Sequence, residues 1–244
     1  MALRDYIEAA IETERDVLID PPHAFALAEE IDAIFTRLLT NGAEKNPIPI
    51  LLCMQVHLLF KAAVRVAISG HYAAMFPIVR TCLEAACYAY RMIQDDSLCG
   101  VWADRHLGEM QLAACRKSFG SAVKDAAKDV EERAPSVGVW VEDLYQGAID
   151  FGAHPNRHSI FRSVSIDEVG EHISVNLAAV YEAESPMVKW ATLAAVETGL
   201  GALCVVALAL RGAADKEIWE TIQTLNDGKN ELAAERHGGQ ATGP

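Results

Sequence analysis

Positive charge is scarce in this chain. It has 21 lysine and arginine residues against 34 aspartate and glutamate residues, which gives a formal net charge of -13. Proteins that bind nucleic acids draw most of their affinity from basic side chains that neutralise phosphates. Basic side chains also dock proteins on anionic membrane surfaces. The composition therefore argues against nucleic acid and against a membrane surface as partners.

An uninterrupted apolar run of the length of a bilayer is also missing. The longest uncharged stretch near the C-terminus, TGLGALCVVALAL, covers 13 residues after Glu197, whereas a spanning helix needs roughly 20 residues. The N-terminal sequence MALRDYIEAAIETERD is charged from its fourth residue and lacks the apolar region of a signal peptide. We therefore expect a cytoplasmic protein in which the apolar stretch forms a buried helix.

Several motifs of enzymes and metal sites do not occur. The chain has no G-x-S-x-G, no glycine-rich phosphate loop, no H-E-x-x-H and no C-x-x-C pair. Most cysteines lie within apolar helical patterns, so we expect them to be reduced core residues. They are Cys53, Cys82, Cys87, Cys99, Cys115 and Cys204. The sequence predicts neither a cofactor nor a metal.

Apolar residues at helical spacing dominate what is present. Hydrophobic residues make up 51% of the chain and charged residues 23%, which is typical of a globular protein. The pattern predicts a mainly α, single-domain helical bundle of about seven or eight helices over residues 1–236, followed by a flexible tail at 237–244. The predicted helices span about 2–18, 23–40, 47–69, 72–94, 98–133 with a break near Gly120, 137–151, 185–211 and 215–226.

One segment has the pattern of β-structure. In SIFRSVSIDEVGEHISVNL, Ile, Phe and Val alternate with polar residues in two short runs separated by DEVGE. This pattern predicts a β-hairpin at about 159–177. A two-stranded ribbon is only marginally stable alone, so it must pack on helices or pair with another chain.

Charged residues recur at helical spacing inside two apolar helices. Arg80, Glu84, Tyr88 and Arg91 share one stripe of the predicted helix 72–94. In the preceding helix His57, Lys61 and Arg65 also stand four residues apart. If the two stripes faced each other, they would form a polar seam within the bundle.

Charges removed from water are costly unless they are paired, and this leaves three interpretations of the stripes. Arg80 and Glu84 form an internal ion pair, or they line a pocket for a small polar or anionic ligand, or they lie at an edge that faces solvent. The candidate ligand-binding residues are Arg80, Glu84, His57, Lys61 and Tyr88, together with His154 and His158 of a later loop.

That loop, DFGAHPNRHS, places Asp150, His154 and His158 four residues apart. Two histidines at this spacing can hold a metal ion when they lie on one helical turn. Pro155 moves His154 out of helical geometry, so we predict no metal here. A capping and turn role and the rim of a pocket remain as alternatives.

Two resemblances to known families arise from short patterns. Arg65 and His71 are separated by five residues, which resembles the Arg-x4-6-His pattern of HEPN ribonucleases, a family of all-helical toxins and nucleases. Unlike that family's pair, His71 follows Ser69 and Gly70 in a turn. The segment ISGHYAAMFPIVRTCLEAACYAYRM also resembles bacterial helical proteins of no settled activity, in which a glycine turn precedes an Arg-Ser/Thr-x-x-Glu helix. That resemblance implies a shared helical fold and a role for Arg80 and Glu84.

These observations predict a non-enzymatic binding or interaction protein with a polar pocket between central helices. The alternative is a hydrolase or HEPN-like ribonuclease that uses Arg80, Glu84, His154 and His158. Three helices are apolar on most faces, so we also expect a homodimer. Its contact would involve the helix at 187–210, where Gly199, Gly201 and Ala202 permit close approach, or the hairpin.

Overall fold

Most of the chain is helical and forms one bundle, which confirms the predicted fold class. The computed structural model describes residues 1–42, 46–153, 164–169, 172–210 and 212–239. Its elements are α1 (Leu3–Ile19), α2 (His23–Asn41), α3 (Pro47–Ile68), α4 (Tyr72–Gln94), α5 (Ser97–Ala103), the 3-10 helix η1 (Asp104–His106), α6 (Glu109–Phe119), α7 (Ala122–Arg133), α8 (Val137–Ala148), the π-helix η2 (Ile149–Ala153), strands β1 (Val164–Val169) and β2 (His172–Leu177), α10 (Pro186–Ala209) and α11 (Lys216–Gly239).

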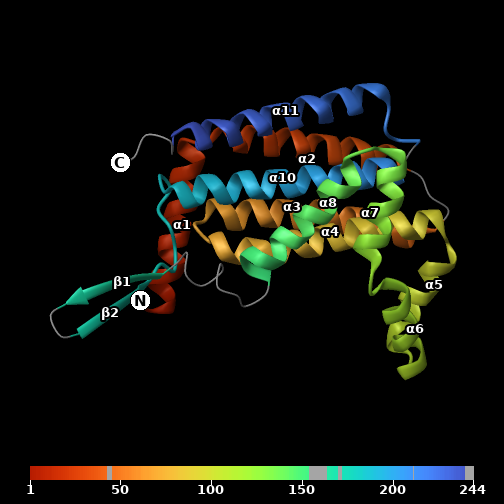
Figure 1. Cartoon of the computed structure of the whole chain (residues 1–244), viewed down its shortest axis with the longest axis horizontal. Coiled ribbons are helices and arrows are strands. Elements are labelled where there is room, and N and C mark those ends of the chain that lie inside the picture. Colours follow the sequence, from red (N-terminus) through yellow and green to blue (C-terminus); the bar gives the residue numbers. More distant parts are fainter. Residues whose placement is uncertain (43–45, 154–163, 170–171, 211, 240–244) are drawn as a thin grey trace.

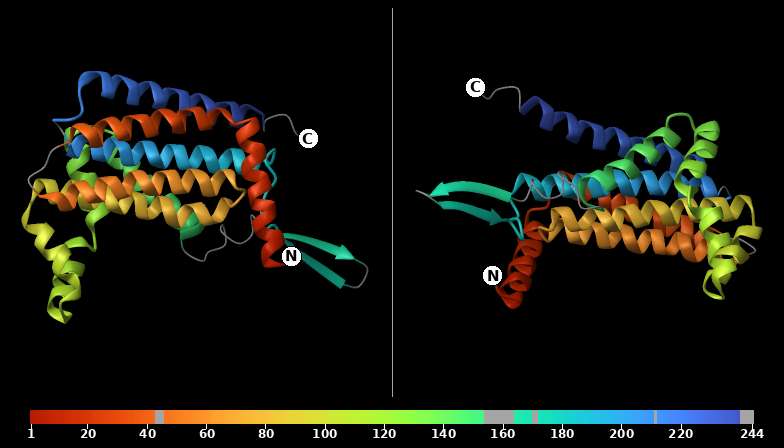
Figure 2. Two further views of the ribbon diagram at one scale, coloured as in Figure 1. Left: turned by 180° about the vertical axis from the view of Figure 1, so that it is seen from behind. Right: turned by 60° about the horizontal axis from the view of Figure 1, so that its bottom comes forward.

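Figure 1 shows the long helices α2, α3, α4, α10 and α11 running side by side along the bundle. Helix α8 crosses them, and α5, α6 and α7 gather at one end. Helix α1 and the hairpin lie at the other end, where the hairpin extends away from the helices. Figure 2 shows the same arrangement from two further directions.

Local signals fix where the central helices begin and where α3 ends. The Asn46 side chain accepts a hydrogen bond from the Ile48 N–H at 3.0 Å, and the Ser185 side chain accepts one from the Met187 N–H at 3.2 Å. Each cap is followed by a proline at a favoured first-turn position. Gly70 has a φ of +83°, a conformation that favours glycine, and it ends the turn between α3 and α4.

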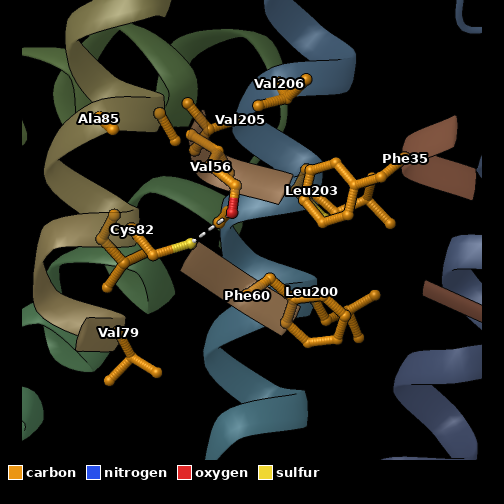
Figure 3. Packing of buried hydrophobic residues seen from close by; sticks show 14 of the residues in the cluster. Phe35, Val56, Phe60, Val79, Cys82, Ala85, Leu200, Leu203, Val205 and Val206 are labelled. Carbon is orange, nitrogen blue, oxygen red and sulfur yellow. Dashed lines mark hydrogen bonds between the residues drawn. The ribbon is translucent and has the colours of Figure 1, made fainter. Parts of the chain in front are cut away.

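Helix α10 lies at the centre of the hydrophobic core, between α2, α3 and α4. In Figure 3, Leu200, Leu203, Val205 and Val206 of α10 pack among side chains of the other three helices. The Cys82 thiol on α4 donates a hydrogen bond to the Val56 carbonyl on α3 at 3.4 Å. The prediction that the apolar stretch after Glu197 forms a buried helix is therefore confirmed.

Among the described residues, two helices, α3 and α10, are nevertheless long and apolar enough to cross a membrane. The run of 13 uncharged residues did not indicate this. Within the bundle, 78% of the most apolar segment of α10 is buried but only 44% of that of α3. Helix α3 leaves Leu51, Met54 and Leu58 exposed. Length and composition alone are weak grounds for a membrane span, because the core helix of a folded domain has the same properties.

The prediction of one continuous helix from 98 to the break near Gly120 is wrong. The chain there forms α5, η1 and α6, with Gly108 in an extended conformation immediately before α6. The break predicted near Gly120 is present between α6 and α7. Helix α11 continues to Gly239, further than the predicted end at 226. The amphipathic pattern shows which side of a segment is buried, but it does not show that the segment turns.

The predicted hairpin is present, but Asp167, Glu168 and Val169, which the prediction placed between the two strand runs, belong to β1. Strands β1 and β2 pair in an antiparallel register from Val164 opposite Leu177 to Val169 opposite His172. The rest of the predicted range, 159–163 and 170–171, lies outside the described residues.

The expectation that Gly199, Gly201 and Ala202 contact a second copy is wrong. A Cβ atom at Gly199 would collide with ring carbons of Phe60, and one at Gly201 would lie 2.6 Å from Leu144. All three residues are buried within one chain. Their small size brings α10 close to α3 and α8, so this part of α10 has no face left for a partner.

Candidate functional site

Arg80 and Glu84 lie on the side of α4 that faces α8. The Arg80 Nε donates to Glu84 Oε1 at 3.1 Å, so the two side chains form an ion pair one helical turn apart. The Tyr145 hydroxyl of α8 donates to the same carboxylate oxygen at 2.9 Å and accepts from Arg80 Nη2 at 3.3 Å. We call these three residues the Arg80–Glu84–Tyr145 cluster.

The cluster is only partly removed from water. The side chains of Arg80 and Glu84 are 26% and 31% exposed, so an ion pair is present but it is not deeply buried. Among the described residues, their partner outside α4 is Tyr145, whereas the seam predicted from the sequence required groups on α3. A partly exposed pair of this kind costs little to maintain.

The surroundings of the cluster fix its protonation. Burial alone would lower the pKa of Arg80, but its hydrogen bond to Tyr145 and the charge of Glu84 outweigh this effect and raise that pKa. Burial raises the pKa of Tyr145, and its hydrogen bond to Glu84 raises it further. At neutral pH the cluster therefore presents a permanent cation and a phenol that keeps its proton.

Tyr88 and Arg91 continue the stripe of α4 toward the turn between α6 and α7. The Tyr88 ring packs on Phe119 with 4.5 Å between ring centroids. Arg91 Nη1 donates to the Ser118 carbonyl at 2.5 Å and lies 3.4 Å from Asp125 Oδ2. These contacts hold the end of α6 and the start of α7 against α4. Tyr88 thus forms a wall beside the cluster.

A cleft of about 400 Å³ opens above the cluster, between α4, α8 and the first turn of α7. Its lining combines charged, amide and hydroxyl side chains with the ring of Phe119. The lining residues are Arg80, Glu84, Tyr88, Phe119, Gly120, Ser121, Ala122, Val123, Lys124, Glu142, Tyr145 and Gln146. The volume is in the range of small-molecule sites in proteins.

His57 and Lys61 do not belong to this cleft, and here the predicted seam is wrong. His57 Nε2 lies 2.5 Å from Asp32 Oδ1, and Lys61 Nζ lies 2.9 Å from the same oxygen. Asp32 is on α2, and Arg65, the next residue of the stripe, pairs with Glu14 of α1 at 3.0 Å. The polar stripe of α3 therefore faces α1 and α2, because its apolar side packs against α4 and α10.

Asp32, His57 and Lys61 form a structural contact between α2 and α3. The His57 ring stacks on Phe35 with 5.1 Å between centroids, and the residue is 9% exposed. Burial alone would raise the pKa of Asp32, but hydrogen bonds from Lys61 and His57 hold it below its usual value. The stabilisation from this carboxylate is present above its unfolded pKa and is lost as pH falls through the lower folded pKa.

His154 and His158 lie outside the described residues, so the geometry neither brings them to the cleft nor separates them from it. Over the described ranges, no group of three His, Cys, Asp or Glu side chains is arranged to hold a metal ion. The pair that resembles the HEPN pattern has other contacts. Arg65 pairs with α1, and His71 contacts the Ser69 hydroxyl at 2.8 Å and the ring of Tyr6.

The six cysteines are buried thiols that form no disulfide, as predicted. Burial raises the pKa of Cys82, Cys87 and Cys204 to about 12. A thiol with such a pKa carries almost no thiolate at neutral pH, so these three are not nucleophiles.

Sequence reasoning missed the residues that other elements bring to the cleft. Tyr145 completes the cluster from 61 residues away along the chain, and Lys124 and Glu142 come from α7 and α8. Nothing in their local sequence distinguishes them from other polar residues of amphipathic helices. Their position depends on how α7 and α8 pack on α4.

Comparison with known proteins identifies no relative of this chain. The chain matches no protein-family model, and neither a curated protein nor a solved structure is significantly similar to it. The assignment of a function therefore depends on the geometry of the cleft.

Proposed function

We propose that this chain is a non-enzymatic binding protein of the bacterial cytoplasm that acts as a homodimer. Its ligand is a small polar molecule with an anionic group, and it binds in the cleft between α4, α7 and α8. The observation that carries the proposal is the Arg80–Glu84–Tyr145 cluster at an open cleft of about 400 Å³. The resemblance to bacterial helical proteins supports a bacterial source, but it indicates no activity.

Three features of the cleft favour an anionic group. Arg80 remains about a quarter exposed although it is paired, and Lys124 adds a second cation to the wall. The first turn of α7 lies along the cleft, and the N–H groups at the start of a helix favour negative charge. Glu84 and Glu142 supply acceptors for hydroxyl or ammonium groups elsewhere on the ligand.

The geometry favours ligand binding over catalysis, because Arg80, Glu84 and Tyr145 already form hydrogen bonds with one another in the absence of a ligand. Such a preformed arrangement orients a ligand with little loss of side-chain entropy. The alternative, a hydrolase or HEPN-like ribonuclease, needs His154 and His158 beside Arg80 and Glu84. No contact among the described residues favours it.

The proposal is tested by calorimetry and thermal unfolding with a panel of small carboxylates and phosphate monoesters. We expect at least one compound to bind the wild-type protein and to raise its unfolding temperature. A ligand at about 100 times its Kd stabilises the folded state by about 2.7 kcal/mol. Arg80→Gln should abolish this shift, while Glu84→Gln should strengthen binding because it removes a carboxylate that competes for Arg80.

Arg65→Gln is the matched control, because Arg65 is 73% exposed and pairs with Glu14 outside the cleft. This variant should bind as the wild type does. Scans without ligand establish that each variant is folded. Binding that survives in Arg80→Gln, or that Arg65→Gln weakens equally, would contradict a site in the cleft.

A further inference from the structure

The hairpin carries an apolar surface that none of the described residues covers. Ile173, Val175 and Leu177 alternate along β2, so they lie on one face of the ribbon. They are 70%, 63% and 68% exposed. The ribbon extends away from the bundle in all three views (Figures 1 and 2).

A hairpin in this exposed position is not expected to be stable without further packing. An isolated two-stranded ribbon is marginal in water, and further packing is needed to hold it. Each exposed branched side chain also forfeits the gain of leaving water, about 1.5 to 3 kcal/mol when burial is complete. The face formed by Ile173, Val175 and Leu177 is therefore expected to be covered in the working protein.

Helix α1 offers a second uncovered stripe at the same end of the bundle. Leu3, Ile7 and Ile11 are spaced by four residues and are 73%, 46% and 48% exposed. The hydroxyl of Thr13 on α1 donates to the Tyr181 carbonyl, four residues beyond the end of β2, at 3.3 Å. Helix α1 and the hairpin thus lie next to each other at one end of the bundle. The apolar stripe of α1 and the apolar face of β2 are both exposed to water.

We propose that a second copy of this chain covers both surfaces. The apolar face of each hairpin packs across the Leu3–Ile7–Ile11 stripe of the other copy, and a two-fold axis relates the two identical contacts. An isologous contact needs two complementary patches on one chain, which these are. The inference specifies which surfaces form the proposed homodimer. It does not depend on ligand binding in the cleft.

The available area fits a stable dimer. Burying one of these side chains removes roughly 60 to 100 Å² of apolar surface from water. The six named side chains of each copy therefore contribute roughly 400 to 600 Å². A standard interface of about 800 Å² per partner would need neighbouring backbone and polar atoms to supply the remainder. The net charge of -13 disfavours nucleic acid or an anionic membrane in the same place.

The first test measures mass in solution by light scattering at micromolar concentration. We expect the wild-type protein at twice its chain mass of 26.5 kDa. Val175→Glu and Ile7→Glu should each shift it to the monomer, because each places a charge in the contact. Leu58→Glu is the matched control on the exposed side of α3, where Leu58 is 66% exposed, and it should remain dimeric.

The second test locates the contact by cross-linking. Protein with Ile7→Cys is mixed with protein carrying Val175→Cys and is oxidised, and we expect a disulfide-linked mixed dimer. The native cysteines are all buried, so background should be low. Efficient linking of Val175→Cys to itself, with no mixed dimer, would show that two hairpins meet and would overturn the proposed contact.

The results of these experiments distinguish between self-association, the proposed contact and ligand binding in the cleft. A wild-type monomer overturns the self-association and the contact together but leaves ligand binding in the cleft unaffected. A wild-type dimer that persists in Val175→Glu and Ile7→Glu but dissociates in Leu58→Glu overturns this contact alone. Loss of ligand binding in Arg80→Gln with an intact dimer supports the ligand site and self-association, and dissociation of Val175→Glu and Ile7→Glu supports the contact.

Discussion

Replacing Gly199 by alanine should lower the free energy of unfolding by about 2 to 3 kcal/mol. The new Cβ would lie far inside van der Waals contact with two ring carbons of Phe60. The Phe60 ring is 2% exposed and packs against Phe35 with 5.9 Å between centroids, so it has little room to move. Either α10 shifts away from α3 or the aromatic packing is strained.

Gly147→Ala is the matched control for this change. Gly147 is also within a helix, α8, but no atom lies within 4 Å of a Cβ placed there. The substitution should raise the stability by about 0.5 to 1 kcal/mol, because alanine is the better helix former. Urea unfolding of both variants measures the difference. Equal stability of Gly199→Ala and wild type would contradict the close approach of α10 to α3.

Replacing Glu197 by glutamine should destabilise the protein by about 2 kcal/mol. Lys229 of α11 has a side chain that is only 7% exposed, and its Nζ lies 3.0 Å from Glu197 Oε1 and 5.0 Å from the centre of the Trp140 ring. Removing the carboxylate leaves a buried ammonium without its counter-charge, which costs about 3 to 5 kcal/mol in fully buried pairs. We expect less here because Glu197 is 38% exposed.

The double variant Glu197→Gln/Lys229→Met separates the charge from the packing. Methionine fills much of the space of the lysine stem without a buried charge, so the double variant should regain most of the lost stability. Thermal and urea unfolding provide both values. A double variant as unstable as the single one would contradict the uncompensated ammonium of Lys229 as the cause of the loss.

Much of the fold follows from signals that act within a few residues. Asn46 followed by Pro47 and Ser185 followed by Pro186 begin α3 and α10 in the structure, and Gly70 ends the turn between α3 and α4. The alternating pattern of the hairpin is equally local. The break between α5 and α6 was missed because an amphipathic repeat can continue across a change of direction.

The candidate site was harder to predict because its contacts join distant residues. Arg80 and Glu84 form the ion pair that their four-residue spacing suggested. Which helix supplies further partners depends on packing, and here α8 supplies Tyr145, while His57 and Lys61 turn to Asp32 on α2. Two helical stripes of similar composition in one hairpin can thus face opposite sides of a bundle.

Native mass spectrometry of the protein, purified without added small molecules, tests the central claim most directly. The account predicts a wild-type mass that exceeds the chain mass by one small molecule per copy. Arg65→Gln should keep this excess, and Arg80→Gln should lose it. A wild-type chain with no bound molecule, or an excess mass that remains in Arg80→Gln, would contradict a ligand site at the Arg80–Glu84–Tyr145 cluster.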